Sequence, residues 1–281
     1  MNDLKIRSKE EWKKAICDNE DLKFFEKILS DLTLRSSKKE LYYPANCEVC
    51  CKDVDFLVDA NCRAKDTDMV NFRERLVCPS CHLNNRMRAF VSFVLKNIDV
   101  KKDIVYINEQ ITSTYKVLKS KLQENITGSE YLGCNYDGGY INSEGIRHED
   151  TLNLSFSDNQ FDVVLSQDVL EHIPDISRAL KEINRVLRSG GKFIFSIPFN
   201  TDSKYTKKRA EIVDGKINHI YPPIYHGNPL GGGSLVFYDY GWDFLDIIKH
   251  AGFSDIYISK FYKPAYGNIG LNSIYFFLAL K

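Results

Sequence analysis

Three segments in the first hundred residues carry apolar side chains at every third or fourth position. This spacing is typical of helices that bury one face. The segments are residues 9–18, 20–34 and 84–97. We therefore expect the N-terminal part of the chain to be largely helical, with an irregular stretch before the third helix.

From about residue 103 the pattern changes to short apolar runs that alternate with helical segments. Such alternation predicts a mostly parallel sheet with helices on both faces. The last run follows another strand without a helix of crossover length, so it should pair antiparallel. The expected helices are 113–123, 175–188 and 240–251. The expected strands are 104–107, 130–134, 146–149, 161–166, 192–197, 254–260 and 273–280.

Residues 198–239 form a long segment with little periodicity and many prolines and glycines. A loop of this length in a compact domain is usually functional or disordered. Its histidines and tyrosines favour a functional role, and we expect it to cover a substrate. Gly231–Gly233 lacks the Lys-Ser/Thr pair of a phosphate-binding loop and predicts a flexible turn.

The composition is that of a globular protein, with 281 residues, 43% hydrophobic and 27% charged. Lysine and arginine number 38 and so do aspartate and glutamate. The balance excludes a global basic field, so nucleic acid is not an expected partner. No apolar run approaches the roughly 18 residues of a membrane span, and the first residues lack a secretory apolar core. We therefore expect a cytoplasmic protein.

Six of the eight cysteines lie between residues 47 and 81. They include two CxxC pairs, Cys47 with Cys50 and Cys78 with Cys81. Two such turns can direct four thiolates at one tetrahedral Zn²⁺ ion, which would supply folding energy to a segment too short for its own core. We expect a structural zinc site at these four residues.

Other uses of the cysteines stay open. The cluster could consist of free thiols in a reduced protein. Cys51, Cys62 and His82 could substitute as metal ligands, whereas Cys17 and Cys134 are expected to be small core residues. The expected division of the chain is a helical segment over 1–41, a zinc-ribbon-like module with its linking helix over 42–99, and an α/β domain over 100–281.

Residues 148–199 carry a dense series of motifs. An acidic residue is followed by L-x-F-x-D-N-x-F-D, a strand, the LEHI element, an amphipathic helix, Ser-Gly-Gly and another strand. This series resembles the Rossmann-like (class I, type 11-like) methyltransferases that use S-adenosylmethionine. The resemblance implies a seven-stranded sheet with an antiparallel last strand. The preceding CPSCHLNNRMRAF stretch is similar to a subgroup with an N-terminal cysteine-rich knuckle.

The resemblance also implies where S-adenosylmethionine lies, because in such folds the ligand sits beyond the carboxyl ends of the parallel strands. Asp150 matches the position that accepts from the adenine amino group, and Asn135 matches the position that holds the ribose hydroxyls. The implied cofactor residues are Ile107, Asn108, Glu109, Asn135, Tyr136, Asp150, Thr151, Leu152, Ser166, Gln167 and Asp168.

The segment after the first strand departs from the family pattern. Asn108, Gln110 and Thr112 stand where the family has glycines, which permit positive φ and close approach of the backbone to a ligand. Tyr106 replaces the usual acidic residue within the strand, and Asn135 can offer ribose only a neutral amide. The loop must therefore take another shape, or the cofactor must lie slightly differently.

Methyl transfer to a hydroxyl often uses a general base, whereas an amine needs less proton removal. His226, in the long segment, and His172, just after a strand that ends at the ligand, are the candidates. Tyr225 could donate to a substrate oxygen. Two of these residues could instead have a structural role. His172 could brace the next helix, and Tyr225 could form an aromatic wall of the site.

The resulting hypothesis is an S-adenosylmethionine-dependent methyltransferase for a small polar acceptor. The cysteine-bearing subgroup is often associated with saccharide modification, which implies a sugar hydroxyl. One alternative is an RNA or protein methyltransferase whose zinc module recognises the substrate through arginines, although acidic residues cancel most of that charge. Another is a non-enzymatic zinc-containing scaffold. The oligomeric state is left open.

Overall fold

The computed structural model describes residues 4–16, 19–64, 68–228, 230–271 and 273–281. Its contacts group the chain into two compact units. One unit holds Met1–Leu4, Lys14–Ile98 and Ser259–Phe276; the other holds Lys5–Lys13, Asp99–Ile258 and Phe277–Lys281. The segment 259–276 thus belongs with N-terminal residues. The three-part division at residues 41 and 99 stays a prediction.

The larger unit is built on a seven-stranded sheet with the order β1-β14-β15-β7-β6-β4-β5. β4 pairs parallel with β5 and β6, β6 pairs parallel with β7, and β15 pairs antiparallel with β7. The predicted α/β sheet of seven strands with an antiparallel last strand is therefore confirmed. The strands are β1 (Lys5–Ile6), β4 (Val105–Ile107), β5 (Ile126–Gly128), β6 (Phe161–Gln167), β7 (Leu187–Ser196), β14 (Asp255–Lys260) and β15 (Tyr275–Leu280).

Two of the seven strands differ from the predicted ones. Residues 130–134 and 146–149 are not strands; they share only an isolated bridge between Glu130 and His148. β5 lies just before the first of these segments, and the remaining edge strand is β1 from the N-terminus. Local apolar runs could not reveal β1, because it contributes only two residues.

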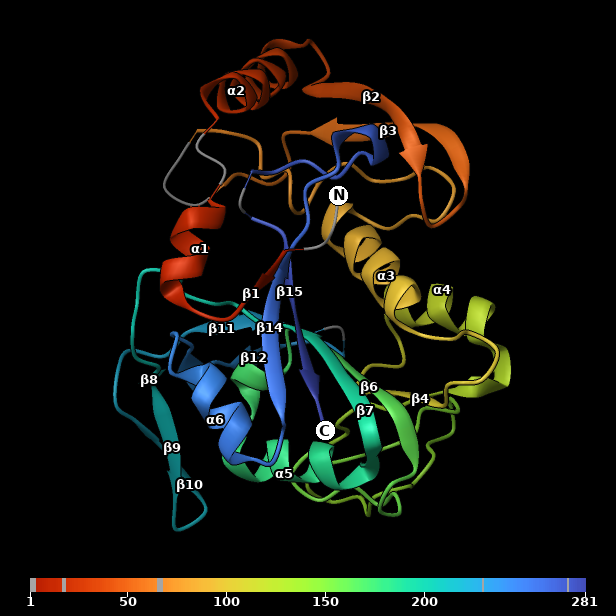
Figure 1. The fold of residues 1–281 in the computed structure, drawn as a ribbon, viewed down its shortest axis with the longest axis vertical. Coiled ribbons are helices and arrows are strands. Elements are labelled where there is room, and N and C mark those ends of the chain that lie inside the picture. Colours follow the sequence, from red (N-terminus) through yellow and green to blue (C-terminus); the bar gives the residue numbers. More distant parts are fainter. Residues whose placement is uncertain (1–3, 17–18, 65–67, 229, 272) are drawn as a thin grey trace. The chain divides into compact units, whose positions relative to one another are not determined.

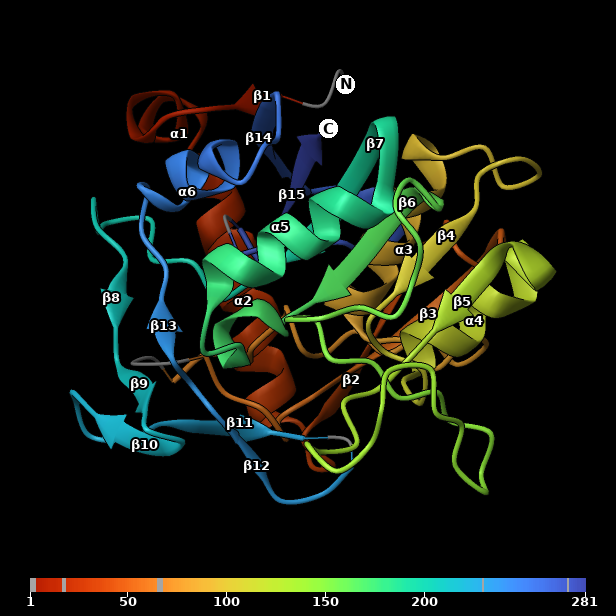
Figure 2. The ribbon, with the colours of Figure 1, turned by 90° about the horizontal axis from the view of Figure 1, so that it is seen from below.

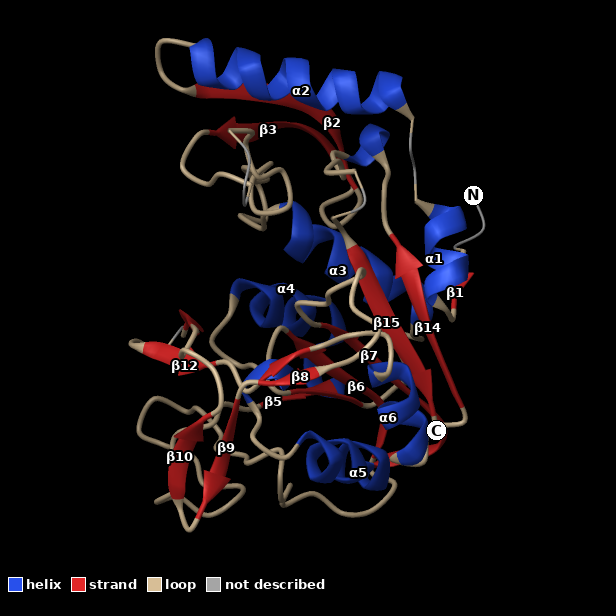
Figure 3. Cartoon of the chain, turned by 90° about the vertical axis from the view of Figure 1, so that its left-hand side faces the viewer, coloured by secondary structure: helices blue, strands red, loops and turns tan. Residues whose placement is uncertain are grey.

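Helices cover both faces of this sheet, with α4 on one side and α5 and α6 on the other (Figure 3). α5 begins after Asp175, whose carboxylate accepts from the backbone amide of Arg178 at 3.0 Å. Its apolar stripe is buried, as predicted. The larger unit holds α1 in part (Lys9–Ala15), α4 (Ser113–Leu122), α5 (Ile176–Val186) and α6 (Phe244–His250), with short helical turns η1 (Gln123–Asn125) and η2 (Leu170–His172).

The ends of several helices also differ from the predictions. α5 ends at Val186 and not at 188, and β7 begins immediately. The Ser-Gly-Gly sequence predicted to end the helix lies inside β7. A Cβ atom on Gly191 would lie 2.8 Å from the Arg188 carbonyl oxygen, so this close approach requires glycine. The helix expected over 9–18 ends at Ala15, and the one expected over 240–251 begins at Phe244.

The long segment 198–239 forms three small antiparallel pairs rather than an unstructured loop. β13 pairs with β8, β10 with β9, and β11 with β12 (Figure 2). Residues 201–211 supply β8 and part of β9. The strands are β8 (Lys207–Lys208), β9 (Ala210–Val213), β10 (Lys216–His219), β11 (Tyr225–Gly227), β12 (Gly233–Leu235) and β13 (Tyr238–Asp239).

The smaller unit contains α2 (Glu20–Arg35), the β2–β3 hairpin (Glu40–Cys47 and Lys52–Asp59), α3 (Asn85–Asn97) and η3 (Pro264–Tyr266) (Figure 1). Phe90 and Phe93 of α3 pack on Phe276 with ring centroids 5.4 Å apart. α2 buries polar Glu26, which accepts from the amide of Gly270 at 2.7 Å. Cys17 lies outside the described residues, and Cys134 is exposed rather than buried.

No helix in the described part of the chain is both long and apolar enough to cross a bilayer.

The edge strand β1 provides a test of the sheet order. Ile6 is fully buried, and we expect Ile6→Ala to lower the free energy of unfolding by about 2–5 kcal/mol through loss of contacts and the cavity left behind. Leu4→Ala is the matched control because Leu4 is 57% exposed, and it should change stability by about 0.5 kcal/mol at most. Urea unfolding measures both. Equal effects of the two substitutions would show that β1 does not complete the sheet.

Candidate functional site

A buried carboxylate lies just beyond the carboxyl end of β6. Glu171, in the short turn η2, has a side chain with no exposed surface. Its Oε1 atom lies 3.6 Å from His172 Nε2 and 3.4 Å from His226 Nδ1. His226 comes from β11, which lies beyond the end of β6 in Figure 2. The two predicted catalytic histidines, 54 positions apart by number, thus meet at one carboxylate.

The surrounding backbone holds this cluster in place. His172 Nδ1 lies 2.8 Å from the carbonyl oxygen of Leu235 in β12. The amide of Phe237 donates to the Glu171 carbonyl at 2.8 Å, and the Tyr240 hydroxyl donates to the Leu170 carbonyl. The segment 198–239 is therefore fastened to the η2 turn, which explains how a sequence with little periodicity takes a defined position.

The charge of Glu171 affects the protonation of His226. The pKa of His226 is raised, chiefly by its contact with the Glu171 carboxylate. Its side chain is 40% exposed, compared with 17% for His172. His226 is thus the member that solvent or a ligand can reach, while Glu171 supplies a buried negative charge behind it.

The third predicted catalytic residue does not join the cluster. Tyr225 precedes His226 on β11 and is 58% exposed. Successive side chains of a strand point to opposite faces, so Tyr225 is directed away from the side on which His226 meets Glu171. A catalytic role for Tyr225 would need a substrate that reaches that opposite face.

The loop after β4 takes a shape that needs no glycine. Residues 108–112 are all described, and none has a positive φ. The amides of Gln110 and Ile111 donate to one oxygen of Glu130 at 2.7 and 2.9 Å, and Thr112 caps α4 by accepting from the amide of Tyr115. Glu130 therefore holds the loop from within the protein. Sequence reasoning missed this residue, because its role depends on β5 lying beside β4.

Polar atoms with unmet hydrogen-bonding capacity gather at the carboxyl ends of β4 and β6. Asn108 Oδ1, Ser166 Oγ and Gln167 Nε2 are buried and have no hydrogen-bond partner within the described chain. Buried polar groups are normally paired, so these three fit a site that receives a polar ligand. Ile107 and Glu109 are buried beside them in the sequence. All five belong to the predicted cofactor set.

Asp168 follows the last residue of β6 and has a strained backbone conformation. Its φ is +53°, in the left-handed region. Its amide donates to the Ser196 carbonyl, and its carboxylate accepts from the Ser196 hydroxyl at 2.8 Å. These bonds tie the end of β6 to the end of β7 and turn the chain toward Glu171.

The remaining predicted cofactor residues lie in the segment between β5 and β6. Asp150 Oδ1 accepts from the amide of Leu152 at 2.9 Å, and Thr151 and Leu152 are partly exposed. Asn135 is exposed, and Tyr136 stacks on Tyr140 with ring centroids 4.7 Å apart. The second carboxylate oxygen of Asp150 makes no hydrogen bond within the described residues.

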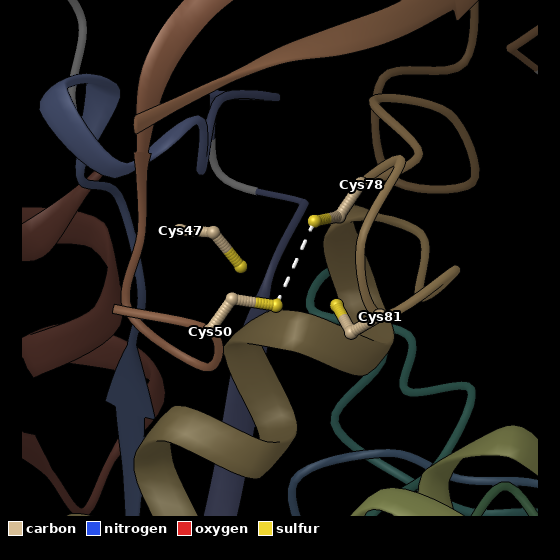
Figure 4. Close-up of side chains that lie close together, drawn as sticks. All are labelled: Cys47, Cys50, Cys78 and Cys81. Carbon is tan, nitrogen blue, oxygen red and sulfur yellow. Dashed lines mark hydrogen bonds between the residues drawn. The ribbon is translucent and has the colours of Figure 1, made fainter. Parts of the chain in front are cut away.

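A second cluster lies in the smaller unit. The sulfur atoms of Cys47, Cys50, Cys78 and Cys81 all lie within 4.8 Å of one another and point toward a common centre (Figure 4). The Cys50 and Cys78 sulfurs are 3.9 Å apart. Four thiolates each bonded at about 2.3 Å to one tetrahedral zinc ion would lie about 3.8 Å apart. The donor set and its spacing therefore fit Zn²⁺.

The two CxxC turns have the same backbone form. Cys51 and His82, each following the second cysteine of its pair, have φ of +55° and +58°. The amide of Cys51 donates to the Cys47 carbonyl, and that of His82 donates to the Cys78 carbonyl. Both residues were considered as substitute metal ligands, but they serve as the left-handed residues that close the turns.

Electrostatics at the cysteines favour a thiolate even without an ion. The pKa of Cys47 is lowered to about 5 because the Cys81 thiol donates to it, and the pKa of Cys81 is raised for the same reason. Arg88 is 2% exposed, stacks 3.8 Å from the Phe56 ring, and carries a positive charge close to three of the cysteines.

The arginines of the cysteine module are largely neutralised within it. Arg75 pairs with Asp59, Arg73 and Arg86 both pair with Glu74, and Arg88 is buried. Phosphate recognition requires basic side chains that are free to face the solvent. The observed pairs therefore weaken the alternative in which this module binds RNA.

Residues 117–195 match a family model described as a methyltransferase domain. A sarcosine/dimethylglycine N-methyltransferase of Halorhodospira halochloris is 51% identical over 49 residues, covering 17% of this chain and 18% of the relative. A demethylmenaquinone methyltransferase of Staphylococcus haemolyticus is 44% identical over 55 residues, covering 20% and 23%. The chain spans about a fifth of the length of these curated relatives.

A solved S-adenosylmethionine-dependent methyltransferase from Mesorhizobium loti aligns with 68% of this chain and 98% of its own, at 14% identity and a TM-score of 0.44. The residues that match the family model include the second half of α4, β5, β6, the Glu171 turn, α5 and most of β7.

The contact between His226 and Glu171 predicts a pH-dependent stability. The folded-state pKa of His226 is raised, so the pair is fully formed below the ordinary value of 6.5 and is lost as the pH rises through the raised value. In buffer without added divalent metal, the stability difference between wild type and His226→Gln should therefore shrink as the pH rises above 6.5.

Urea unfolding at a series of pH values measures this difference. His219→Gln is the control, because His219 is exposed on β10 in the same long segment and should leave the pH dependence of the wild type in place. A difference for His226→Gln that stays constant across the range would contradict the ion pair.

Proposed function

We propose that this protein is an S-adenosylmethionine-dependent methyltransferase that acts on a small polar acceptor. The observation that carries the proposal is the methyltransferase-domain match over residues 117–195, which includes the carboxyl end of β6 and the Glu171 turn beside it. Ligands of open α/β sheets bind at this edge. The unpaired polar atoms of Asn108, Ser166 and Gln167 at that edge support the same placement.

In the proposed complex, residues at and beyond the ends of β4, β5 and β6 would hold the cofactor. Asp150 accepts from the adenine amino group with its free carboxylate oxygen, and Asn135 contacts the ribose. Tyr136, Thr151 and Leu152 flank these groups. Asn108, Ser166 and Gln167 would offer their unpaired polar atoms to the cofactor. The loop held by Glu130 replaces the family's glycine loop.

S-adenosylmethionine, when bound, supplies an activated methyl group on a sulfonium. The chain's own contribution is to align the acceptor and to handle its proton. His226, with His172 beside it and Glu171 behind it, is the group we assign to that proton. This cluster would take up the proton of the acceptor and pass it to solvent.

The acceptor is proposed to be a hydroxyl or amine of a small molecule. The sequence suggests a sugar hydroxyl. The curated relatives are named for sarcosine, dimethylglycine and demethylmenaquinone, none of which is a sugar. An acceptor screen should therefore include small amines beside saccharides. The exposed tyrosines of the long segment could stack on a ring of the acceptor or bond its hydroxyls. The partly exposed His226 could contact its polar reacting atom.

We assign a structural Zn²⁺ ion to Cys47, Cys50, Cys78 and Cys81. The paired CxxC turns and the spacing of their sulfurs support this assignment. The positive charge of Arg88 would offset part of the negative charge of four thiolates.

The cofactor assignment predicts the effect of a change at Asp150. Asp150→Ala removes a charge-assisted bond to adenine and should weaken S-adenosylmethionine binding by about 1–3 kcal/mol. Isothermal titration of zinc-replete protein with S-adenosylmethionine and S-adenosylhomocysteine measures it. Glu144→Ala, an exposed change in the same connecting segment, should leave the affinity unaltered.

Two results of that titration would contradict the proposal. Unchanged affinity in Asp150→Ala would place the adenine elsewhere. Absence of binding up to millimolar cofactor would favour the non-enzymatic scaffold.

The zinc assignment predicts that Cys78→Ser releases the ion and lowers the melting temperature, because a structural metal contributes folding energy directly. Mass spectrometry of bound metal and thermal unfolding measure the two effects. Cys62→Ser is the control, since Cys62 lies outside the four-sulfur cluster. A Cys78→Ser protein with the metal content and melting temperature of the wild type would exclude the site.

A further inference from the structure

Glu171 is a buried carboxylate whose charge is not balanced by ordinary hydrogen bonds. Its side chain has no exposed surface, and neither oxygen has a hydrogen-bond partner in the described chain. Its two histidine neighbours lie at 3.4 and 3.6 Å, beyond the usual 2.7–3.2 Å of an N–H···O bond. A buried charge is normally paired or bound to a metal ion.

The hydrogen bond between His172 and Leu235 determines which ring nitrogen of His172 carries the proton. Nδ1 lies 2.8 Å from the Leu235 carbonyl oxygen, which can only accept, so Nδ1 carries the proton. In the neutral ring, Nε2 then directs a lone pair toward Glu171 Oε1. Two acceptors that face each other at this distance repel unless a proton or a metal ion lies between them. Metal-binding histidines typically donate their other N–H to a carbonyl in this way.

The spacing of the three side chains matches the edges of a metal coordination shell. Nitrogen and oxygen ligands about 2.1 Å from a tetrahedral ion lie about 3.4 Å from one another. The observed separations from Glu171 Oε1 are 3.4 Å to His226 Nδ1 and 3.6 Å to His172 Nε2. A ligand atom of each of the three residues lies within 4.8 Å of the other two.

We propose that Glu171, His172 and His226 bind a divalent transition-metal ion, with Zn²⁺ as the best match to two imidazoles and one carboxylate. Three protein ligands leave at least one coordination position open, as in catalytic rather than structural zinc sites. His226 is the exposed member, so the open position faces the side from which a ligand can enter.

This site deepens the proposed function and rests on it for the location of the acceptor. An acceptor oxygen or nitrogen at the open position would have its pKa lowered by the ion. The favoured acceptors are therefore those with a hydroxyl or amine that can coordinate a metal. A metal ion and a proton compete for the same nitrogen of His226, so metal binding would release the proton from this side chain.

The chain carries an internal reference for the test, because the four-cysteine site and this site differ in ligand chemistry. Full-length protein is loaded with Zn²⁺, and then separately with Co²⁺, and bound metal is counted by mass spectrometry. Wild type should hold two ions per chain. Its Co²⁺ spectrum should combine thiolate charge-transfer bands from the cysteines with weaker bands from a nitrogen–oxygen site.

Two variants isolate the proposed site. His226→Ala and Glu171→Gln should each reduce the bound metal to one ion and leave the thiolate bands intact. Loss of a ligand should weaken Zn²⁺ binding at this site by more than about 100-fold, since loss of a supporting residue alone costs 10–100-fold. His219→Ala, a histidine change elsewhere in the long segment, should keep both ions. His226 is partly exposed, so its substitution tests the site even if the buried Glu171→Gln fails to fold.

Cofactor titration of the same samples separates the two proposals. A second ion that His226→Ala removes supports the metal site, whether or not S-adenosylmethionine binds. A single ion per chain, with a purely thiolate Co²⁺ spectrum that His226→Ala does not alter, overturns it even if the cofactor binds normally.

Discussion

The burial of the Glu171 carboxylate is the constraint on which the candidate active site depends. A charge removed from water must be matched by a cation or by strong hydrogen bonds, and here two histidine nitrogens lie 3.4 and 3.6 Å from the Glu171 carboxylate. One histidine follows Glu171 directly, while the other comes from β11 of the long segment. The charge therefore explains why that segment is held against the η2 turn rather than left as a loose loop.

At the neighbouring edge of the sheet, the chain lacks the glycine loop of the methyltransferase family that its sequence resembles. Glu130 accepts from two loop amides, and the loop keeps ordinary φ values throughout. The backbone groups that a glycine loop would offer to a ligand are thus partly used within the protein. Side chains at the strand ends, those of Asn108, Ser166 and Gln167, are left to provide polar contacts instead.

The smaller unit depends on the same balance of buried charge. Its four sulfurs lie at a spacing suited to Zn²⁺, and the nearly buried Arg88 places a positive charge beside them. Arg88 also donates to the carbonyl groups of Leu76, Tyr266 and Gly267, so one side chain connects the cysteine turns to the segment that returns after β14.

The sequence by itself determined the features that follow from local spacing. Apolar periodicity identified α5, β6 and the antiparallel last strand, and the CxxC spacing identified the four cysteines that meet. It also placed His172 and His226 among the candidates. Only the tertiary structure decided that both histidines face Glu171, that Glu130 holds the β4 loop, and that β1 forms a sheet edge while 146–149 does not. These contacts join residues far apart in the chain, and no local pattern of hydrophobic or polar positions encodes which distant segments will meet.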